Sequence, residues 1–375
     1  MTEPYWLAEP AEPLSAMRLE GRPDVAVIGA GVTGCACALA LAEGGLRVRV
    51  HEARRIASGA SGRSGGFALR GAAMRYDDAR ERLGADKAAS LWLLTERYLD
   101  RLEALAGDAL RRCGSLRLAD GEEEREKLWA EYAALREDGF AVEWVERLEP
   151  PLDELFSGAI RHPKDGALQP ARWVRRLAAR AVAAGAEIVE ESRVESIDAL
   201  DADAVVIATD GYTSGLLPAL DEAVRPVRGQ VIATEPLGRR VFDCPHYSRW
   251  GFDYWQQIPE GRLVLGGRRD ARLDEEYTTE EAVTEPIQQE LEALAERLLG
   301  ERPRVSHRWS GIFGATEDRL PLTGPIPGRD GLWVAAGYSG HGNVLGLACG
   351  ELVAGAILGR PPPPELALFD PARVF

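Results

Sequence analysis

The stretch Asp24-Val-Ala-Val-Ile-Gly-Ala-Gly-Val-Thr-Gly34 decides the fold. Its first residues form a short apolar run, typical of a parallel strand that is buried on both faces. The glycines that follow have the spacing G-x-G-x-x-G, and an apolar helix is expected over Cys35–Glu43. A second strand is expected over Arg47–His51. The stretch and its neighbours therefore predict a complete βαβ unit.

Each glycine of this spacing has its own task when a dinucleotide binds. Gly29 permits a tight turn, Gly31 lets the backbone approach a pyrophosphate, and Gly34 lets the helix pack closely on the strand. The helix N-terminus offers free N–H groups and a partial positive charge to the phosphates. Glu52, after the second strand, can accept hydrogen bonds from ribose hydroxyls and disfavours a 2′-phosphate. We therefore expect FAD or NAD rather than NADP.

Two further glycine-rich segments favour FAD over NAD. Ala57-Ser-Gly-Ala-Ser-Gly-Arg-Ser-Gly-Gly66 has too many glycines for a regular element, and we expect a loop that lies against the longer cofactor. Gly337-Tyr-Ser-Gly-His-Gly342 is predicted to join a buried strand to a helix. The N-terminus of that helix would stabilise negative charge on the reduced flavin ring.

The remaining pattern predicts an α/β protein with a Rossmann-type FAD-binding domain (a parallel sheet with helices) and an inserted α+β substrate domain with an antiparallel sheet. The antiparallel strands are expected over Val227–Thr234, Tyr247–Ile258 and Leu263–Arg268. The expected division of the chain is an N-terminal arm on the surface at 1–22, an FAD-binding domain at 23–80, 160–225 and 315–375, and a substrate domain at 81–159 and 226–314.

Composition excludes some classes of function. The net charge of −15 argues against a nucleic-acid partner, because phosphate binding requires a basic surface. No apolar run approaches the roughly 20 residues of a membrane span, and the N-terminus lacks the pattern of a secretory signal. The five cysteines form no CxxC pair, so we expect no metal site and a reducing, cytoplasmic compartment.

Several segments resemble the D-amino-acid-oxidase-type FAD oxidoreductases, the group of the glycine, sarcosine and D-amino acid oxidases. Besides the glycine segments, the resemblance rests on Arg308-Trp-Ser-Gly311 and Leu320-Pro-Leu-x-Gly324. Asp253-Tyr254 and Leu265-Gly266-Gly267 look most like the bacterial γ-glutamylputrescine oxidase branch. The resemblance covers about residues 20–360 and implies two domains and FAD. It also implies oxidation of the C–N bond of an amine or N-substituted amino acid to an imine, by hydride transfer to flavin N5, followed by hydrolysis.

Departures from the family pattern bear on the substrate. Glycine-oxidase-like members have a carboxylate-binding Arg where this chain has Phe313, and sarcosine-oxidase-like members have a Lys where it has Val344. Because an unpaired buried carboxylate is costly, we expect a larger or more amine-like substrate. Arg63, Arg70 or Arg268 could replace the missing cation.

Further departures bear on the cofactor and the oxidant. No cysteine lies near Gly311, where the covalent flavin link of sarcosine-oxidase-like members would fall, so FAD is expected to bind non-covalently. Their oxygen-activating Lys would fall near Val264, and no lysine is close in sequence, so the acceptor is O₂ or another molecule.

Several alternatives remain open. They are a D-amino acid, glycine or sarcosine-type oxidase or dehydrogenase, a flavin subunit of a hetero-oligomeric dehydrogenase, a flavin domain acting on modified tRNA bases, and an NAD-dependent dehydrogenase.

The predicted site has two parts. The residues expected at the reacting centre are His341, Tyr254, Trp309 and Phe313, with Trp255 as a further aromatic candidate for the cavity wall. The residues expected to bind the cofactor are Gly29, Gly31, Val32, Thr33, Gly34, Glu52, Ala53, Arg54, Gly59, Ala60, Ser61, Arg63, Ser64, Gly65, Gly66, Val194, Ala208, Thr209, Gly211, Gly337, Tyr338, Gly340, His341, Gly342, Asn343 and Val344.

Overall fold

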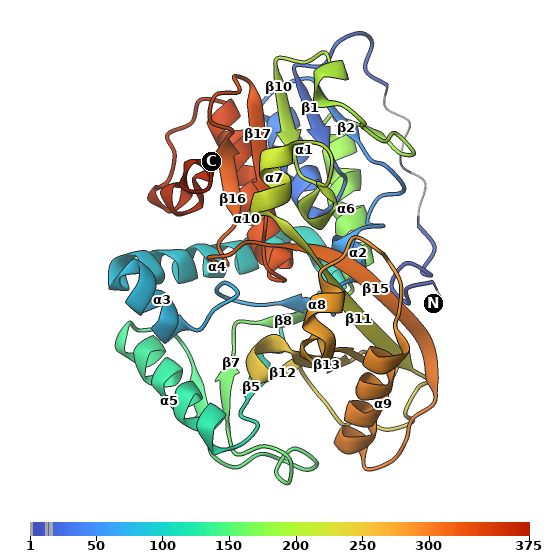
Figure 1. Cartoon of the computed structure of the whole chain (residues 1–375), viewed down its shortest axis with the longest axis vertical. Helices are drawn as coiled ribbons and strands as arrows, with labels where there is room; N and C mark the ends of the chain where they lie inside the picture. The colour runs from blue at the N-terminus through green and yellow to red at the C-terminus, as the bar shows by residue number, and fades with distance from the viewer. Residues whose placement is uncertain (1–2, 12–13, 15–17) are drawn as a thin grey trace.

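The computed structural model describes residues 3–11, 14 and 18–375, and its two large sheets occupy the upper and lower parts of Figure 1. The upper sheet has six strands, of which five are parallel and the edge strand β16 is antiparallel. In sheet order the strands are β16 Leu322–Pro325, β17 Leu332–Ala336, β10 Ala204–Ile207, β1 Val25–Ile28, β2 Val48–His51 and β9 Glu187–Val189.

Glycines set the packing of the helices beside this sheet. Helix α1 (Val32–Glu43) lies against α10 (Gly342–Ile357), and a Cβ atom at Gly346 would lie 2.9 Å from the Thr33 hydroxyl oxygen. The small residues therefore let the two helix backbones approach closely. Helix α6 (Pro170–Ala183) packs on α1; its side-chain cap comes from Gln169, which accepts from the Arg172 N–H at 2.7 Å.

The lower sheet has eight strands. In sheet order they are β15 Val305–Ala315, β11 Arg225–Thr234, β14 Leu263–Gly267, β13 Asp253–Gln257, β12 His246–Ser248, β5 Ser115–Leu118, β7 Ala159–His162 and β6 Glu143–Val145. Helix α9 (Glu285–Leu299) packs on it through a separate apolar core that includes Trp255 and Leu291. A small third sheet joins β3 Phe67–Ala68, β8 Gly166–Leu168 and β4 Leu110–Arg111. The remaining helices are α2 Ala60–Arg63, α3 Tyr76–Leu83, α4 Ala85–Ala106, α5 Glu122–Glu137, α7 Pro218–Ala223 and α8 Leu273–Glu276.

The α/β fold class, with its parallel and antiparallel sheets, is confirmed. Two local expectations are wrong. The single strand expected over Tyr247–Ile258 is two antiparallel strands, because Arg249, Trp250 and Gly251 have positive φ angles and turn the chain between β12 and β13. The loop expected over 57–66 contains the single helical turn α2.

The N-terminal segment is only partly described, since residues 1–2, 12–13 and 15–17 lie outside the described residues. Trp6 is 1% exposed, and its indole N–H donates to the Ser64 carbonyl at 2.8 Å. Glu9 pairs with Arg172 at 2.8 Å. This part of the expected surface arm is therefore anchored by a buried side chain. Within the described chain, no helix combines the length and apolarity needed to cross a bilayer.

Candidate active site

A cavity of about 1300 Å³ begins where the parallel strands end and continues to the eight-stranded sheet. Its wall includes the segments that follow β1, β2, β10 and β17, at the carboxyl edge where open α/β sheets bind ligands. Pockets for drug-sized ligands measure about 300–1,000 Å³. The cavity is therefore large enough for a dinucleotide together with a small substrate.

The first glycine segment leaves no room for side chains. A Cβ atom at Gly29 would lie 2.8 Å from the Ala208 carbonyl oxygen, and one at Gly31 would lie 2.8 Å from the Ser61 hydroxyl oxygen. A Cβ atom at Gly34 would collide with the Gly29 carbonyl group. These glycines have the tasks that a pyrophosphate-binding turn requires, so the cradle fits a dinucleotide.

Glu52 lies on the cavity wall just beyond β2. One carboxylate oxygen accepts from the Ala30 N–H at 2.8 Å, and the other accepts from the Arg54 N–H at 2.9 Å. Each oxygen keeps a free lone pair, because a carboxylate has about four acceptor sites. The side chain is thus fixed by the backbone and can still accept from ribose hydroxyls.

The second glycine segment is braced from three directions. The Ser61 hydroxyl accepts from the Val32 N–H at 3.1 Å, which ties α2 to the first turn of α1. Arg63 donates to the Ser58 carbonyl at 2.6 Å and the Ser310 carbonyl at 3.0 Å, and it pairs with Glu281 at 3.3 Å. The charge of Arg63 is therefore already used within the protein.

Trp309 supports this segment from behind. Its side chain is fully buried, and its indole N–H donates to the Arg63 carbonyl at 2.8 Å. Neither Trp309 nor Trp255 lines the cavity, so the expectation that these two rings form its wall is wrong. Both are buried in the sheet core, where large apolar rings gain most from burial.

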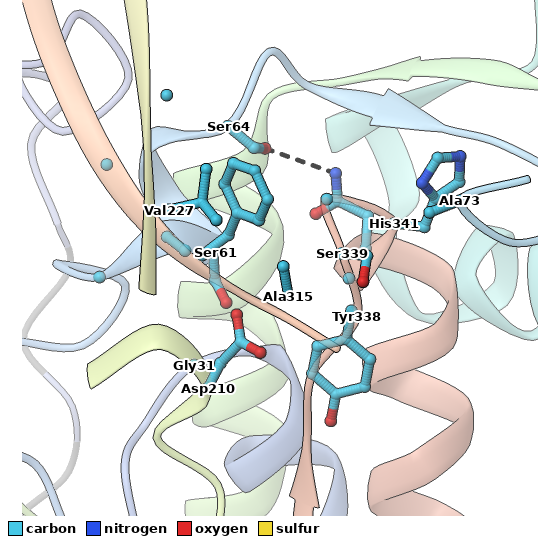
Figure 2. Close-up of a pocket in the computed structure, with 18 of the residues that line it drawn as sticks. Gly31, Ser61, Ser64, Ala73, Asp210, Val227, Ala315, Tyr338, Ser339 and His341 are labelled. Carbon is cyan, nitrogen blue, oxygen red and sulfur yellow. Dashed lines mark hydrogen bonds between the residues drawn. The ribbon is translucent and has the colours of Figure 1, made fainter. Parts of the chain in front are cut away.

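The last glycine segment closes the cavity at the N-terminus of α10. The Asn343 amide donates to the Phe67 carbonyl at 2.8 Å and to the Ser64 hydroxyl at 3.4 Å, the dashed contact of Figure 2. The first turn of α10 contains no acidic residue, so its partial positive charge faces the cavity unopposed by a side chain of that turn.

His341 precedes α10 and lines the cavity. Burial, followed by the charges of Arg117 and Arg269, lowers its pKa to about 4. Its Nδ1 atom has no hydrogen-bond partner among the described residues. The ring is therefore neutral at neutral pH.

Asp210 is a site residue that the sequence reasoning missed. Its two oxygens accept from the Gly337 N–H and the Gly314 N–H, each at 2.8 Å, and it lines the cavity (Figure 2). One carboxylate thus joins the end of β10, the end of β15 and the last glycine segment. An acid directly after a buried strand and before a glycine was the signal that could have identified it.

Three aromatic rings form a chamber at the far end of the cavity. Phe67, Tyr254 and Phe313 all line it, and the first two meet edge to face with centroids 5.9 Å apart. Because Gly266 and Gly229 have no side chains, they leave space for two of these rings. A Cβ atom at Gly266 would collide with the Tyr254 ring, and one at Gly229 would lie 3.7 Å from the Phe313 ring. Burial raises the pKa of Tyr254, so its hydroxyl stays protonated.

The structure brings most of the predicted cofactor residues to the cavity wall. Those lining it are Gly29, Gly31, Thr33, Glu52, Ala53, Arg54, Gly59, Ala60, Ser61, Arg63, Ser64, Gly65, Val194, Ala208, Thr209, Tyr338, Gly340, His341, Gly342, Asn343 and Val344. Those behind it are Val32, Gly34, Gly66, Gly211 and Gly337. Within the described ranges, no group of three or more His, Cys, Asp and Glu side chains is arranged to hold a metal ion.

Comparison with known proteins agrees with this geometry. Residues 24–356 match the family model DAO, described as FAD dependent oxidoreductase. The chain is 29% identical to the glycine oxidase of Geobacillus kaustophilus, over 94% of this chain and 97% of that protein. A crystal structure of glycine oxidase from the same organism superposes with a TM-score of 0.78, covering 94% of this chain and 98% of that one. The chain is also 26% identical to the γ-glutamylputrescine oxidoreductase of Escherichia coli K12, over 90% of this chain and 84% of that protein.

Proposed function

The chain belongs to the DAO family of FAD-dependent oxidoreductases, and we propose that it oxidises the C–N bond of an amine or N-substituted amino acid to an imine that water then hydrolyses. The observation that carries the proposal is the continuous cavity, which joins the glycine cradle of a dinucleotide to a chamber walled by Phe67, Tyr254 and Phe313. The dinucleotide is FAD, and the family match excludes an NAD-dependent dehydrogenase.

The residues that would hold FAD come from the three glycine segments. The pyrophosphate would bind at the N-terminus of α1, beside Gly31 and Ser61, and a ribose would bind Glu52. Asn343 at the start of α10 and the aromatic chamber would hold the flavin ring. When bound, FAD supplies the acceptor for the hydride that leaves the carbon next to the substrate nitrogen.

The chain's own residues then act by positioning and by excluding water. The aromatic rings of the chamber offer an apolar surface that holds the substrate carbon in place. The positive end of α10 stabilises negative charge at the adjacent end of the site. At neutral pH the His341 ring is neutral and the Tyr254 hydroxyl is protonated, because burial lowers the pKa of the first and raises that of the second. The reaction needs no strong base, since the substrate amine can lose its proton before hydride transfer.

We further propose that FAD binds non-covalently. Among the described residues no cysteine lines the cavity, and burial raises the pKa of the Cys35 and Cys349 thiols. Trichloroacetic acid precipitation of the purified yellow protein tests this directly. The flavin should remain in the supernatant, whereas flavin in the pellet would contradict it.

We also propose that the chain forms two domains. The FAD-binding domain comprises 23–80, 160–225 and 315–375, and the substrate domain comprises 81–159 and 226–314. One apolar cluster contains strand residues of the six-stranded sheet alone and another those of the eight-stranded sheet alone, which supports the division, while a third cluster includes residues of both sheets. Strand β7 crosses the boundary at residue 160, since it belongs to the eight-stranded sheet as a whole.

Product analysis tests the reaction. The FAD-loaded protein, incubated with a panel of primary and N-methylated amines and amino acids, should release one carbonyl product per two-electron equivalent passed to O₂ or to an artificial acceptor. Acceptor reduction without a carbonyl product would show that the C–N bond is not the bond oxidised.

A further inference from the structure

Nine arginines of the described residues line the cavity, and they differ in their partners. Arg54, Arg63, Arg70, Arg75, Arg117 and Arg193 each form an ion pair with a carboxylate. Arg225 and Arg319 are exposed to solvent. Arg269 alone among the nine is partly buried without a carboxylate within 4.0 Å in the described part of the chain. Its neighbour Asp270 is engaged by Arg249 instead.

The surroundings of Arg269 leave its charge available to the cavity. Its guanidinium carbon lies 4.4 Å from the ring centroid of Phe252 and 5.7 Å from that of Phe313. One of its nitrogens donates to the Gly251 carbonyl at a long 3.4 Å. A guanidinium has five N–H donors, so most of them have no strong acceptor here. Burial lowers the pKa of Arg269, as expected for a cation that is desolvated without a full counter-charge.

Arg269 also lies beside the aromatic chamber. It follows β14, which pairs with β13 on one side and β11 on the other, and these strands bring Tyr254 and Gly229 to the same wall. Its guanidinium lies over the ring of Phe313, which faces Gly229 and Gly340. A cation is thus present at the chamber wall although position 313 itself is apolar.

We propose that Arg269 binds a carboxylate of the substrate, so that the amine oxidised at this site is an amino acid or N-substituted amino acid. The inference rests on the proposed function and narrows its substrate class. Arginine is suited to the task, because its planar fork binds both oxygens of a carboxylate at once. Arg63 and Arg70 are committed to Glu281 and Glu96, and Arg268 pairs with Asp253 and does not line the cavity.

Binding to the oxidised protein tests the assignment without turnover. Benzoate and the uncharged benzamide would be measured by equilibrium dialysis with the FAD-loaded protein and with R269M, R269K and R225M. Arg225 lines the same cavity but is exposed, so R225M removes the same charge and serves as the matched control. FAD content and thermal midpoint establish that each variant is folded.

The native protein should bind benzoate and not benzamide. R269M should weaken benzoate binding about 10- to 100-fold, the effect of losing a charge-assisted hydrogen-bonded pair. R269K should recover part of the affinity, and R225M should match the native protein. Equal benzoate binding by R269M and native protein would overturn the inference, as would a native protein that does not distinguish benzoate from benzamide.

The two proposals fail in different ways. If benzoate binds through Arg269 and no amine reduces the flavin, carboxylate binding by Arg269 stands and the proposed oxidation fails. If amines without a carboxylate reduce the flavin as readily in R269M as in the native protein, and benzoate does not bind, the oxidation stands and the inference fails.

Discussion

The Thr33 hydroxyl, in the first turn of α1, donates a 2.8 Å hydrogen bond to the hydroxyl of Tyr338 in the last glycine segment. Both side chains are at least 95% buried, and the two residues lie 305 positions apart in the chain. The contact therefore fixes the two ends of the cofactor site against each other.

Y338F leaves the buried Thr33 hydroxyl without this acceptor. The expected loss is about 1–3 kcal/mol in the free energy of unfolding, measured by urea denaturation of the FAD-loaded protein. The double variant T33V/Y338F removes both polar atoms and should be less destabilised than the two single losses would sum to. Strict additivity would show that the hydroxyls do not interact.

Gly34 and Gly355 form a matched pair of helical glycines. G34A places a Cβ atom against the Gly29 carbonyl and should abolish FAD binding, because the turn and the helix can no longer meet. G355A meets only the Arg360 side chain at 3.9 Å and should raise stability by about 0.4–1 kcal/mol. Flavin absorbance after gel filtration and thermal midpoints measure the two effects. Retention of FAD by G34A would contradict the packing described for the first glycine turn.

D210N keeps the shape of Asp210 and removes one acceptor. The asparagine amide would then face either the Gly314 or the Gly337 N–H with a second donor. We expect a loss of about 1–3 kcal/mol in stability and weaker FAD binding. E195Q, at an exposed carboxylate on the cavity rim, is the control and should behave as the native protein. Unchanged FAD affinity in D210N would remove Asp210 from the cofactor framework.

The buried imidazole of His246 should make the stability of the folded protein depend on pH. Burial lowers its pKa to about 4, and its ring stacks on Trp255 with centroids 5.4 Å apart. The unfolded chain takes up a proton near pH 6.5, but the folded chain does so only near pH 4, so native stability falls as the pH drops between these values. The gap corresponds to about 3 kcal/mol. H246F keeps a ring against Trp255 and should lose stability less steeply between pH 7 and 4.5, measured by urea unfolding. An identical slope for H246F and the native protein would show that folding does not lower the pKa of His246.

The sequence correctly predicted those strands, helices and turns whose pattern lies within one continuous stretch of the chain. The βαβ unit, the acid after β2 and the glycine segments each have a physical requirement that one stretch of chain reveals. The turn at Arg249-Trp250-Gly251 was missed, because two of its three residues with positive φ are not glycines and their identity does not indicate a turn. Trp309 was assigned to the wall because composition does not tell which face of a strand is the core.

The site residues that were missed depend on contacts between distant segments. Asp210 is recognisable only when Gly314 and Gly337 are seen around it, and Arg269 only when the partners of the other arginines are known. The expectation of a larger or more amine-like substrate rested on positions 313 and 344, with Arg63, Arg70 or Arg268 as replacement cations. It did not consider a cation brought by β14 to the ring of Phe313.

Flavin-dependent oxidation of a C–N bond is tested most directly by anaerobic mixing of the FAD-loaded protein with amines and amino acids, followed by absorbance at about 450 nm. The predicted result is rapid bleaching by one class of amine or N-substituted amino acid, with release of the corresponding carbonyl compound. Colour that returns on admission of air would identify an oxidase, and colour that returns only with another acceptor would identify a dehydrogenase. A flavin that no amine or amino acid bleaches, but that a reduced nicotinamide does, would contradict the proposed function.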